Sequence, residues 1–146
     1  MSQQSNTLQL SNPDLLKQQC FIKDGWHDAS DDATIDVSNP FSGDIIGNVP
    51  SLTTDDVNDA VAASHEAQIT WAAKTAKERA ELLQKWADLI DANKEDLAII
   101  MTAEQGKPLT ESRGEVGYAN SFIRWFAEEG KRVYGDVIPA NQTQLR

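Results

Sequence analysis

The sequence predicts a mostly α-helical fold preceded by two short β-hairpins. Up to about residue 50, short runs of β-branched and aromatic residues alternate with turn residues, which is typical of small paired strands. From Ser51 onward, apolar residues recur every three or four positions, which is the period of an amphipathic helix. Because strands and helices do not alternate, this order indicates either a small α+β domain or the lead-in to a larger fold.

Length, composition and charge limit the number of domains and the partners that this protein can have. The 146 residues suit one domain or a piece of a larger one, and 40% hydrophobic with 25% charged residues is an ordinary soluble composition. No apolar run reaches the roughly 18 residues that span a bilayer, so no membrane partner is expected. A net charge of -10 repels phosphate backbones and disfavours nucleic acid as a partner. The N-terminal stretch resembles no secretory or transit signal, so a cytoplasmic location is expected.

The strand-forming half begins after a polar stretch at residues 1–10, which is expected to be flexible. Asn12 and Pro13 are typical of the cap and first residue of a short helix, here running to Leu16. The dipeptide Asp24-Gly25 is expected to provide the positive φ angles of a tight hairpin turn. A second hairpin is predicted where two β-branched runs flank a turn; its residues are Thr34, Ile35, Val37, Asn39, Pro40, Gly43, Ile45 and Ile46.

Four helices are predicted after the hairpins. The pairs Thr53 with Asp56 and Thr75 with Glu78 have the spacing of capping boxes, which begin the first two helices. A third helix is expected to be capped by Asn93 and to end at Gly106, and a fourth to run from about 108 to 133. The faces predicted to point inward are Leu82, Leu83, Trp86, Leu89 and Ile90 on the second helix, and Val116, Ala119, Phe122, Ile123 and Phe126 on the fourth.

The stretch "EQGKP" contains the Gly-Lys pair found in phosphate-binding loops. Such a loop lies between a strand and a helix and uses several backbone N–H groups, whereas Pro108 has no N–H and the preceding segment has helical periodicity. A helix end at Gly106 followed by a new helix explains both residues better. Gly114 and Gly117 then fall inside a helix, where close approach of another backbone would explain them.

The residues by themselves name no reaction. Cys20 is the only cysteine and lies in an apolar strand pattern, where a thiol is buried and unreactive, so a nucleophilic role with His27 is disfavoured. The two histidines, His27 and His65, are too isolated to suggest a metal site and are expected at a strand end and on a solvated helix face.

Three ordered motifs nevertheless resemble a known family. "VSNPFSGDIIGNVP", "WAAKTAKERAELLQKWADLI" and "MTAEQGKPLTESRGEVGYANSFIRWFAEEGKRVYGDVIP" resemble the opening segment of aldehyde dehydrogenases, from about residue 21 to 139, and the last run is similar to succinate-semialdehyde dehydrogenase. The resemblance implies an α/β aldehyde dehydrogenase-like fold, of which this segment is the mostly helical beginning. It implies that residues 11–139 belong to the N-terminal part of the coenzyme-binding domain and residues 140–146 to the start of an extended oligomerisation segment.

The family resemblance also implies a chemistry. A cysteine thiolate attacks the aldehyde, hydride passes to NAD or NADP, and a glutamate-activated water hydrolyses the thioester, giving the acid in reactions such as those of GABA catabolism. In the family these groups lie further along the chain, and Cys20 matches none of them. We therefore expect an N-terminal fragment without catalytic or cofactor-binding residues, inactive alone and part of a homo-oligomer when complete.

Five residues match family positions with other roles. Tyr118 and Phe122 match positions that line the substrate tunnel, with plain core packing as an equal alternative. Val37, Ser38 and Glu104 match a structural site for a monovalent cation such as sodium, to which oxygen ligands are suited. A non-catalytic helical interaction module is the alternative function. The choices between NAD and NADP, and between succinate and glutarate semialdehyde, stay open.

Overall fold

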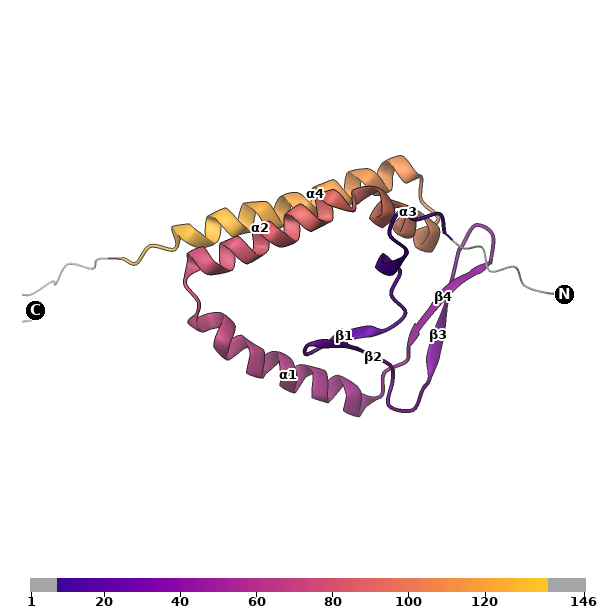
Figure 1. The fold of residues 1–146 in the computed structure, drawn as a ribbon, viewed down its shortest axis with the longest axis horizontal. Coiled ribbons are helices and arrows are strands. Elements are labelled where there is room, and N and C mark those ends of the chain that lie inside the picture. Colours follow the sequence, from indigo (N-terminus) through magenta and orange to yellow (C-terminus); the bar gives the residue numbers. More distant parts are fainter. Residues whose placement is uncertain (1–7, 137–146) are drawn as a thin grey trace, which may run out of the picture.

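The computed structural model describes residues 8–136 and shows two β-hairpins followed by four α-helices (Figure 1). The elements are η1 (Pro13–Leu15), β1 (Cys20–Ile22), β2 (Gly25–His27), β3 (Thr34–Ser38), β4 (Ile45–Pro50), α1 (Thr54–Ala73), α2 (Ala76–Ala92), α3 (Lys94–Gln105), α4 (Leu109–Glu129) and η2 (Gly130–Arg132). The predicted mostly helical fold with two N-terminal hairpins is confirmed. The predicted oligomerisation segment at 140–146 lies outside the described residues, as does most of the stretch at 1–10. Within the described range, no helix is long and apolar enough to cross a membrane.

Both predicted hairpins are present, each as a separate two-stranded antiparallel sheet. In the first, Ile22 pairs with Gly25, so the loop consists of Lys23 and Asp24. The positive φ of 61° belongs to Lys23, and the expectation for Asp24-Gly25 was wrong because Gly25 is taken into the strand as the partner of Ile22. In the second, Gly43 has the positive φ of 77° that its turn requires.

The helix ends follow local sequence signals closely. The capping boxes Thr53 with Asp56 and Thr75 with Glu78 are both formed, and Gly106 ends α3 with a left-handed φ of 70°. Asn93 lies at the cap position of α3 but gives that helix no side-chain cap, because its side chain donates to the carbonyl of Leu89 in the last turn of α2. α4 is shorter than expected because its last turn tightens into η2, which ends at Arg132.

The core of the chain lies between α2, α3 and α4, and small side chains fill it. α2 and α4 run antiparallel and side by side, and α3 packs against α4 (Figure 1). The buried apolar residues of these three helices are Ala80, Ala87, Ala98, Ala103, Val116 and Ala127. Ser112 is the largest side chain that is fully buried among the described residues. The helices therefore approach through small residues rather than through large apolar ones.

The inward faces predicted for α2 and α4 were wrong for most of their members. Leu82, Trp86, Leu89, Ala119, Phe122 and Phe126 are exposed, Leu83, Ile90 and Ile123 are half-buried, and only Val116 is buried. The physical reason is that each helix carries two apolar faces, and helical periodicity does not show which of the two meets the other helix. The face that packs is the one with small residues, such as Ala80, Ala87 and Ala127.

α1 lies apart from the other helices and contains no buried residue (Figure 1). Its first turn is joined to the loop after β2, because Ser30 donates to the Asp56 carboxylate from its hydroxyl at 3.1 Å and from its backbone N–H at 3.2 Å. The arrangement leaves Val57, Val61 and Ile69 of α1 exposed.

The two glycines predicted to admit a neighbouring backbone have a different environment. Apart from its chain neighbours and the backbone of its own helix, no described residue lies within 4 Å of a Cβ built on Gly114. A Cβ on Gly117 would lie 3.0 Å from the Nζ of Lys94, the flexible end of a side chain. No close backbone approach within the described residues explains either glycine.

Candidate functional site

The end of α3 packs against the end of β3, and these two elements carry the three residues predicted to bind a cation, Glu104 on α3 and Val37 and Ser38 on β3. A Cβ on Gly106, just after α3, would lie only 2.8 Å from Pro40, just after β3, so the helix end is packed against the strand end. Glu104 lies two residues before Gly106 and is exposed, while Ser38 lies two residues before Pro40.

The strand end itself is irregular at this junction. The pairing of β3 with β4 shifts register between Val37 and Ser38. Such a bulge disrupts the ladder and leaves backbone groups unpaired, and a freed carbonyl is an oxygen ligand suited to a hard cation. No group of three or more His, Cys, Asp or Glu side chains in the described part of the chain has the arrangement of a metal centre.

The two predicted tunnel residues lie together on α4. The rings of Tyr118 and Phe122 meet edge to face, with centroids 4.9 Å apart. Tyr118 is 67% exposed and Phe122 is 46% exposed, so neither belongs to the core of this chain. Trp125, one turn further along, is also exposed. This face of α4 is therefore an aromatic surface that is free to contact another part of a larger protein or a ligand.

A polar network crosses the packed side of the same helix, and sequence reasoning missed it. Asn120 donates to the carbonyl of Ala87 at 3.0 Å and to the Asp91 carboxylate at 2.8 Å. Arg124 donates to Asp88 at 2.8 Å and to Asp91 at 2.7 Å. The hydrogen bonds from Arg124, and then from Asn120, lower the pKa of Asp91. The carboxylates of Asp91 and Asp88 in turn raise the pKa of Arg124. The available signal was an asparagine among small residues at helical spacing.

Two further carboxylates are held in place by the chain. Asp96, 4% exposed, accepts hydrogen bonds from the backbone N–H groups of Ser11 and Asn12 at 2.9 and 2.8 Å and so anchors the N-terminal segment on α3. Glu95 forms a two-bond ion pair with Arg113, whose hydrogen bonds lower the pKa of Glu95. Both interactions hold segments of the chain together, the N-terminal segment on α3 and α3 on α4.

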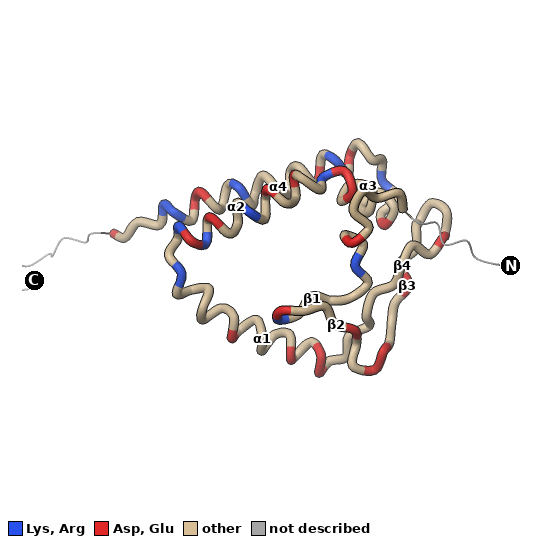
Figure 2. Tube along the Cα trace, viewed as in Figure 1, with Lys and Arg blue, Asp and Glu red and all other residues tan. Residues whose placement is uncertain are grey.

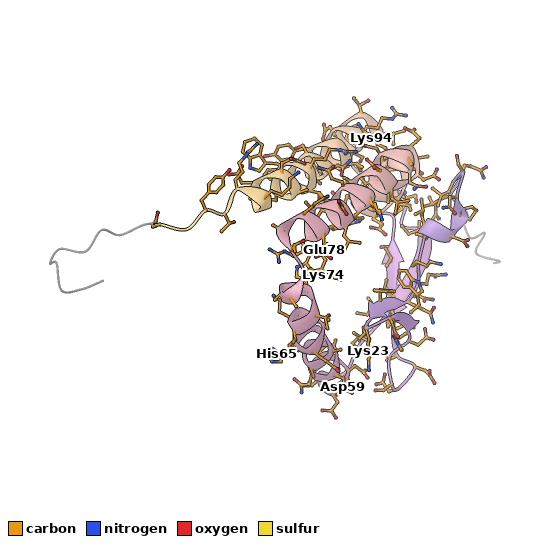
Figure 3. The ribbon with its side chains drawn as sticks, turned by 60° about the vertical axis from the view of Figure 1, so that its left-hand side comes forward. Lys23, Asp59, His65, Lys74, Glu78 and Lys94 are labelled. Atoms are coloured by element: carbon orange, nitrogen blue, oxygen red, sulfur yellow. The ribbon has the colours of Figure 1, made fainter. Side chains whose placement is uncertain are left out.

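A cavity of about 560 Å³ lies between the first hairpin and α1. Lys23 of the hairpin loop and Asp59 of α1 are among the residues that line this cavity (Figure 3). None of the predicted site residues lines it. Cys20 is half-buried in β1 and is not among the lining residues either.

Charge is divided unevenly between the two halves of the chain (Figure 2). Residues 24–73 contain ten Asp and Glu residues and no Lys or Arg, so this segment carries a formal charge equal to the net -10 of the whole chain. The remaining 13 acidic and 13 basic residues cancel. Such a field disfavours anionic partners at the hairpins and α1.

The sequence and the structure are both similar to known proteins. The aldehyde dehydrogenase family matches residues 26–146, where similarity had been expected from about 21 to 139. Succinate-semialdehyde dehydrogenase [NADP(+)] GabD of Escherichia coli is 48% identical over 139 residues, which cover 95% of this chain and 29% of that protein. A glutarate-semialdehyde dehydrogenase and a 3-sulfolactaldehyde dehydrogenase, both of Pseudomonas putida, are 48% and 53% identical over the same shares.

Among solved structures, an aldehyde dehydrogenase of Brucella melitensis biovar abortus 2308 is 60% identical and has a TM-score of 0.92, over 94% of this chain and 28% of that one. The chain thus spans about 29% of the length of the curated relatives it matches. Because the family match covers most of its residues, this chain belongs to the aldehyde dehydrogenase family.

Proposed function

We propose that this chain is the N-terminal part of a subunit that oxidises succinate semialdehyde, or a related semialdehyde, to the acid with NAD or NADP. The observation that carries the proposal is 48% identity, over 95% of the chain, to a relative named as an NADP-dependent succinate-semialdehyde dehydrogenase. The thioester chemistry and the coenzyme site belong to parts of the subunit beyond these residues. Cytoplasmic location, homo-oligomeric assembly and a role in GABA catabolism are parts of the same proposal.

The substrate is proposed at the level of its class. Relatives of nearly equal identity are named for succinate semialdehyde, glutarate semialdehyde and 3-sulfolactaldehyde. All three names describe an aldehyde that carries an acidic group at its other end. We therefore propose an ω-acidic aldehyde as the substrate class.

A segment exchange tests the proposal. The part of the E. coli enzyme that matches this chain is replaced by this sequence, and reduction of NAD and of NADP is followed by absorbance with each of the three aldehydes. Because the segment supplies packing surface and no catalytic group, the hybrid subunit should retain activity with at least one aldehyde, whereas purified residues 1–146 should show none. A folded hybrid that is inactive with all three, or turnover by the chain alone, would contradict the proposal.

We also propose that Val37, Ser38 and Glu104 hold a monovalent cation such as sodium. The support is the packing of the α3 end on the β3 end and the bulge at Val37 and Ser38. Tyr118 and Phe122 are proposed to face the substrate tunnel, supported by their exposure on α4 in this chain.

A helical interaction module is the second candidate function. The observation that favours it is the exposure of large apolar residues on two faces of the α2 and α4 pair, such as Leu89 at 63% and Trp125 at 62%. Such surfaces are uncommon on a monomeric protein and mark binding sites for another polypeptide.

A further inference from the structure

α2 and α4 each carry two parallel seams of residues, and only one seam of each helix is used in their contact. The seams are separated by two positions in the sequence and follow the alternating spacing of four and three that is typical of packed helices. The inner seams are Ala80, Gln84, Ala87 and Asp91 on α2, and Val116, Asn120, Ile123 and Ala127 on α4; the outer seams are Leu82, Trp86 and Leu89 on α2, and Tyr118, Phe122 and Trp125 on α4.

The outer seams are the more hydrophobic pair, although they are the exposed ones. Burial of apolar area is the main driving force for helix association, it has no direction, and it grows with the area removed from water. Leucine and tryptophan on α2 facing three aromatic residues on α4 would bury more apolar area than alanines do. Hydrophobicity alone would therefore favour packing of the outer seams, and another interaction has to select the inner ones.

The inner seams carry a hydrogen-bond network that is buried at Asn120 and partly exposed at Arg124, and the outer seams have no comparable acceptors. Asn120 is 2% exposed and donates both amide protons to α2, one to the Ala87 carbonyl and one to Asp91. One turn later, Arg124 donates to the Gln84 amide oxygen at 3.0 Å as well as to Asp88 and Asp91. The outer seam of α2 offers only apolar side chains. If α4 were rotated to that seam, Asn120 would face water and its hydrogen bonds to Ala87 and Asp91 would be lost.

The network leaves one buried polar atom of Asn120 without a hydrogen bond within residues 8–136, which lowers the stability of the packed helices. The Oδ1 atom of Asn120 is buried and has no hydrogen-bond donor among the described residues. A buried acceptor without a donor is unfavourable, so Asn120 is not the best residue for stability at this position. In coiled coils, a single buried asparagine on a seam specifies the register and the number of helices while lowering stability.

We propose that Asn120, assisted by Arg124, is a positioning residue that selects the inner face of α4 for packing on α2 and thereby leaves the aromatic outer face of α4 exposed. This role concerns which face packs and is independent of the proposed enzymatic function. It predicts that apolar replacement of Asn120 changes the packed face before it removes helical structure.

Cross-linking tests the proposal in the full 146-residue chain. In a Cys20→Ser background, one variant carries Gln84→Cys with Glu128→Cys, whose native side chains are 3.3 Å apart across the inner contact. A second variant carries Leu89→Cys with Phe122→Cys, which report on the outer seams at a similar antiparallel register. A short thiol-reactive cross-linker is applied to dilute protein, and the monomeric product is quantified for each pair.

The expected result is cross-linking of the inner pair and not of the outer pair with Asn120 present. With Asn120→Leu, the ratio of outer to inner product should rise at least about tenfold, which corresponds to about 1.4 kcal/mol. The matched control is Asn58→Leu, the same replacement at an exposed position on α1, which should leave the ratio unchanged.

Two results would overturn the proposal. One is a preference for the outer pair, or no cross-linking of either pair, with Asn120 present. The other is an unchanged ratio in Asn120→Leu with its helical circular dichroism retained, since the alanines would then select the face by themselves. If Asn120→Leu loses its helical signal, Asn120→Ala and Arg124→Met provide the same comparison, and an unchanged ratio in both also overturns the proposal.

Discussion

At the scale of single residues, the start of α1 is fixed by reciprocal hydrogen bonds between Thr53 and Asp56. The Asp56 carboxylate accepts from the Thr53 backbone N–H at 2.9 Å and from its hydroxyl at 2.9 Å, and further bonds come from Ser30. These bonds, led by the Thr53 backbone N–H, lower the pKa of Asp56 from 3.8 to about 2. The ionised carboxylate of Asp56 is therefore the form that joins the start of α1 to the loop after β2.

The stability that Asp56 contributes depends on pH, in a direction set by its lowered pKa. Because the pKa of Asp56 is lower in the folded chain, its stabilising contribution is complete above about 3.8 and is lost as the pH falls towards about 2. Thr53→Val removes the hydroxyl and should raise the pKa of Asp56 towards 3.8, as measured by NMR titration of the carboxyl carbon. Thr54→Val, at the neighbouring exposed position, is the control. An identical titration in Thr53→Val would show that the hydroxyl plays no part.

The proposed cation site leads to a second prediction at the residue scale. Glu104→Gln keeps the size of the side chain and removes its charge, so it should weaken the binding of a hard cation. Thermal unfolding in sodium chloride and in choline chloride, at equal ionic strength, should differ for the unchanged sequence and not for Glu104→Gln. Glu66→Gln, an exposed position on α1, should behave like the unchanged sequence. Equal melting curves for the unchanged sequence in the two salts would count against the site.

At the scale of elements, the junction of α3 and α4 depends on one glycine. Gly106 has a left-handed φ of 70°, which costs other residues about 1–2 kcal/mol, and a Cβ there would meet Pro40 at 2.8 Å. Gly106→Ala should therefore lower the free energy of unfolding by about 1–2 kcal/mol or more, measured by urea unfolding.

Gly114 provides the opposite comparison within the neighbouring helix. It lies in α4 with no described atom near the position of a Cβ, so Gly114→Ala should raise the free energy of unfolding by about 0.5–1 kcal/mol. The same substitution thus has opposite expected signs at two glycines eight residues apart. A stabilising Gly106→Ala would refute the assigned role of that glycine as the helix end.

At the scale of the whole molecule, the exposed outer seams should govern the behaviour of the isolated chain in solution. Burying a large apolar side chain contributes roughly 1.5–3 kcal/mol, so the exposed faces favour self-association of the chain or poor solubility. Leu89→Lys combined with Trp125→Lys should reduce association, measured by sedimentation velocity over a range of concentrations. Gln68→Lys, an added charge at an exposed polar position on α1, should have little effect. A monodisperse monomer of the unchanged sequence with cooperative unfolding would contradict this expectation.

Local chemistry made much of the fold predictable. Capping boxes, the Gly106 and Pro108 boundary and the turn at Asn39 to Gly43 are short-range features, in which a residue contacts others only a few positions away. The hairpin turn at Lys23 was not predictable in detail, because the pairing register decides which residues lie in the loop. The family was recognisable from ordered motifs. The proposed cation and tunnel residues come from that resemblance, since their chemistry involves partners distant in sequence.

Short-range signals were sufficient to locate both hairpins and most of the helix ends, because backbone hydrogen bonds and capping side chains act within a few residues. Which face of each helix packs depends instead on contacts between residues far apart in the sequence. Helical periodicity shows that Leu82 and Ala80 lie on different faces, but it does not show which face meets α4. That choice depends on the hydrogen-bond acceptors of α2 meeting Asn120 and Arg124 of α4, which lie 29 to 40 residues further along the chain. The apolar faces that remain exposed are consequently decided by the same contacts.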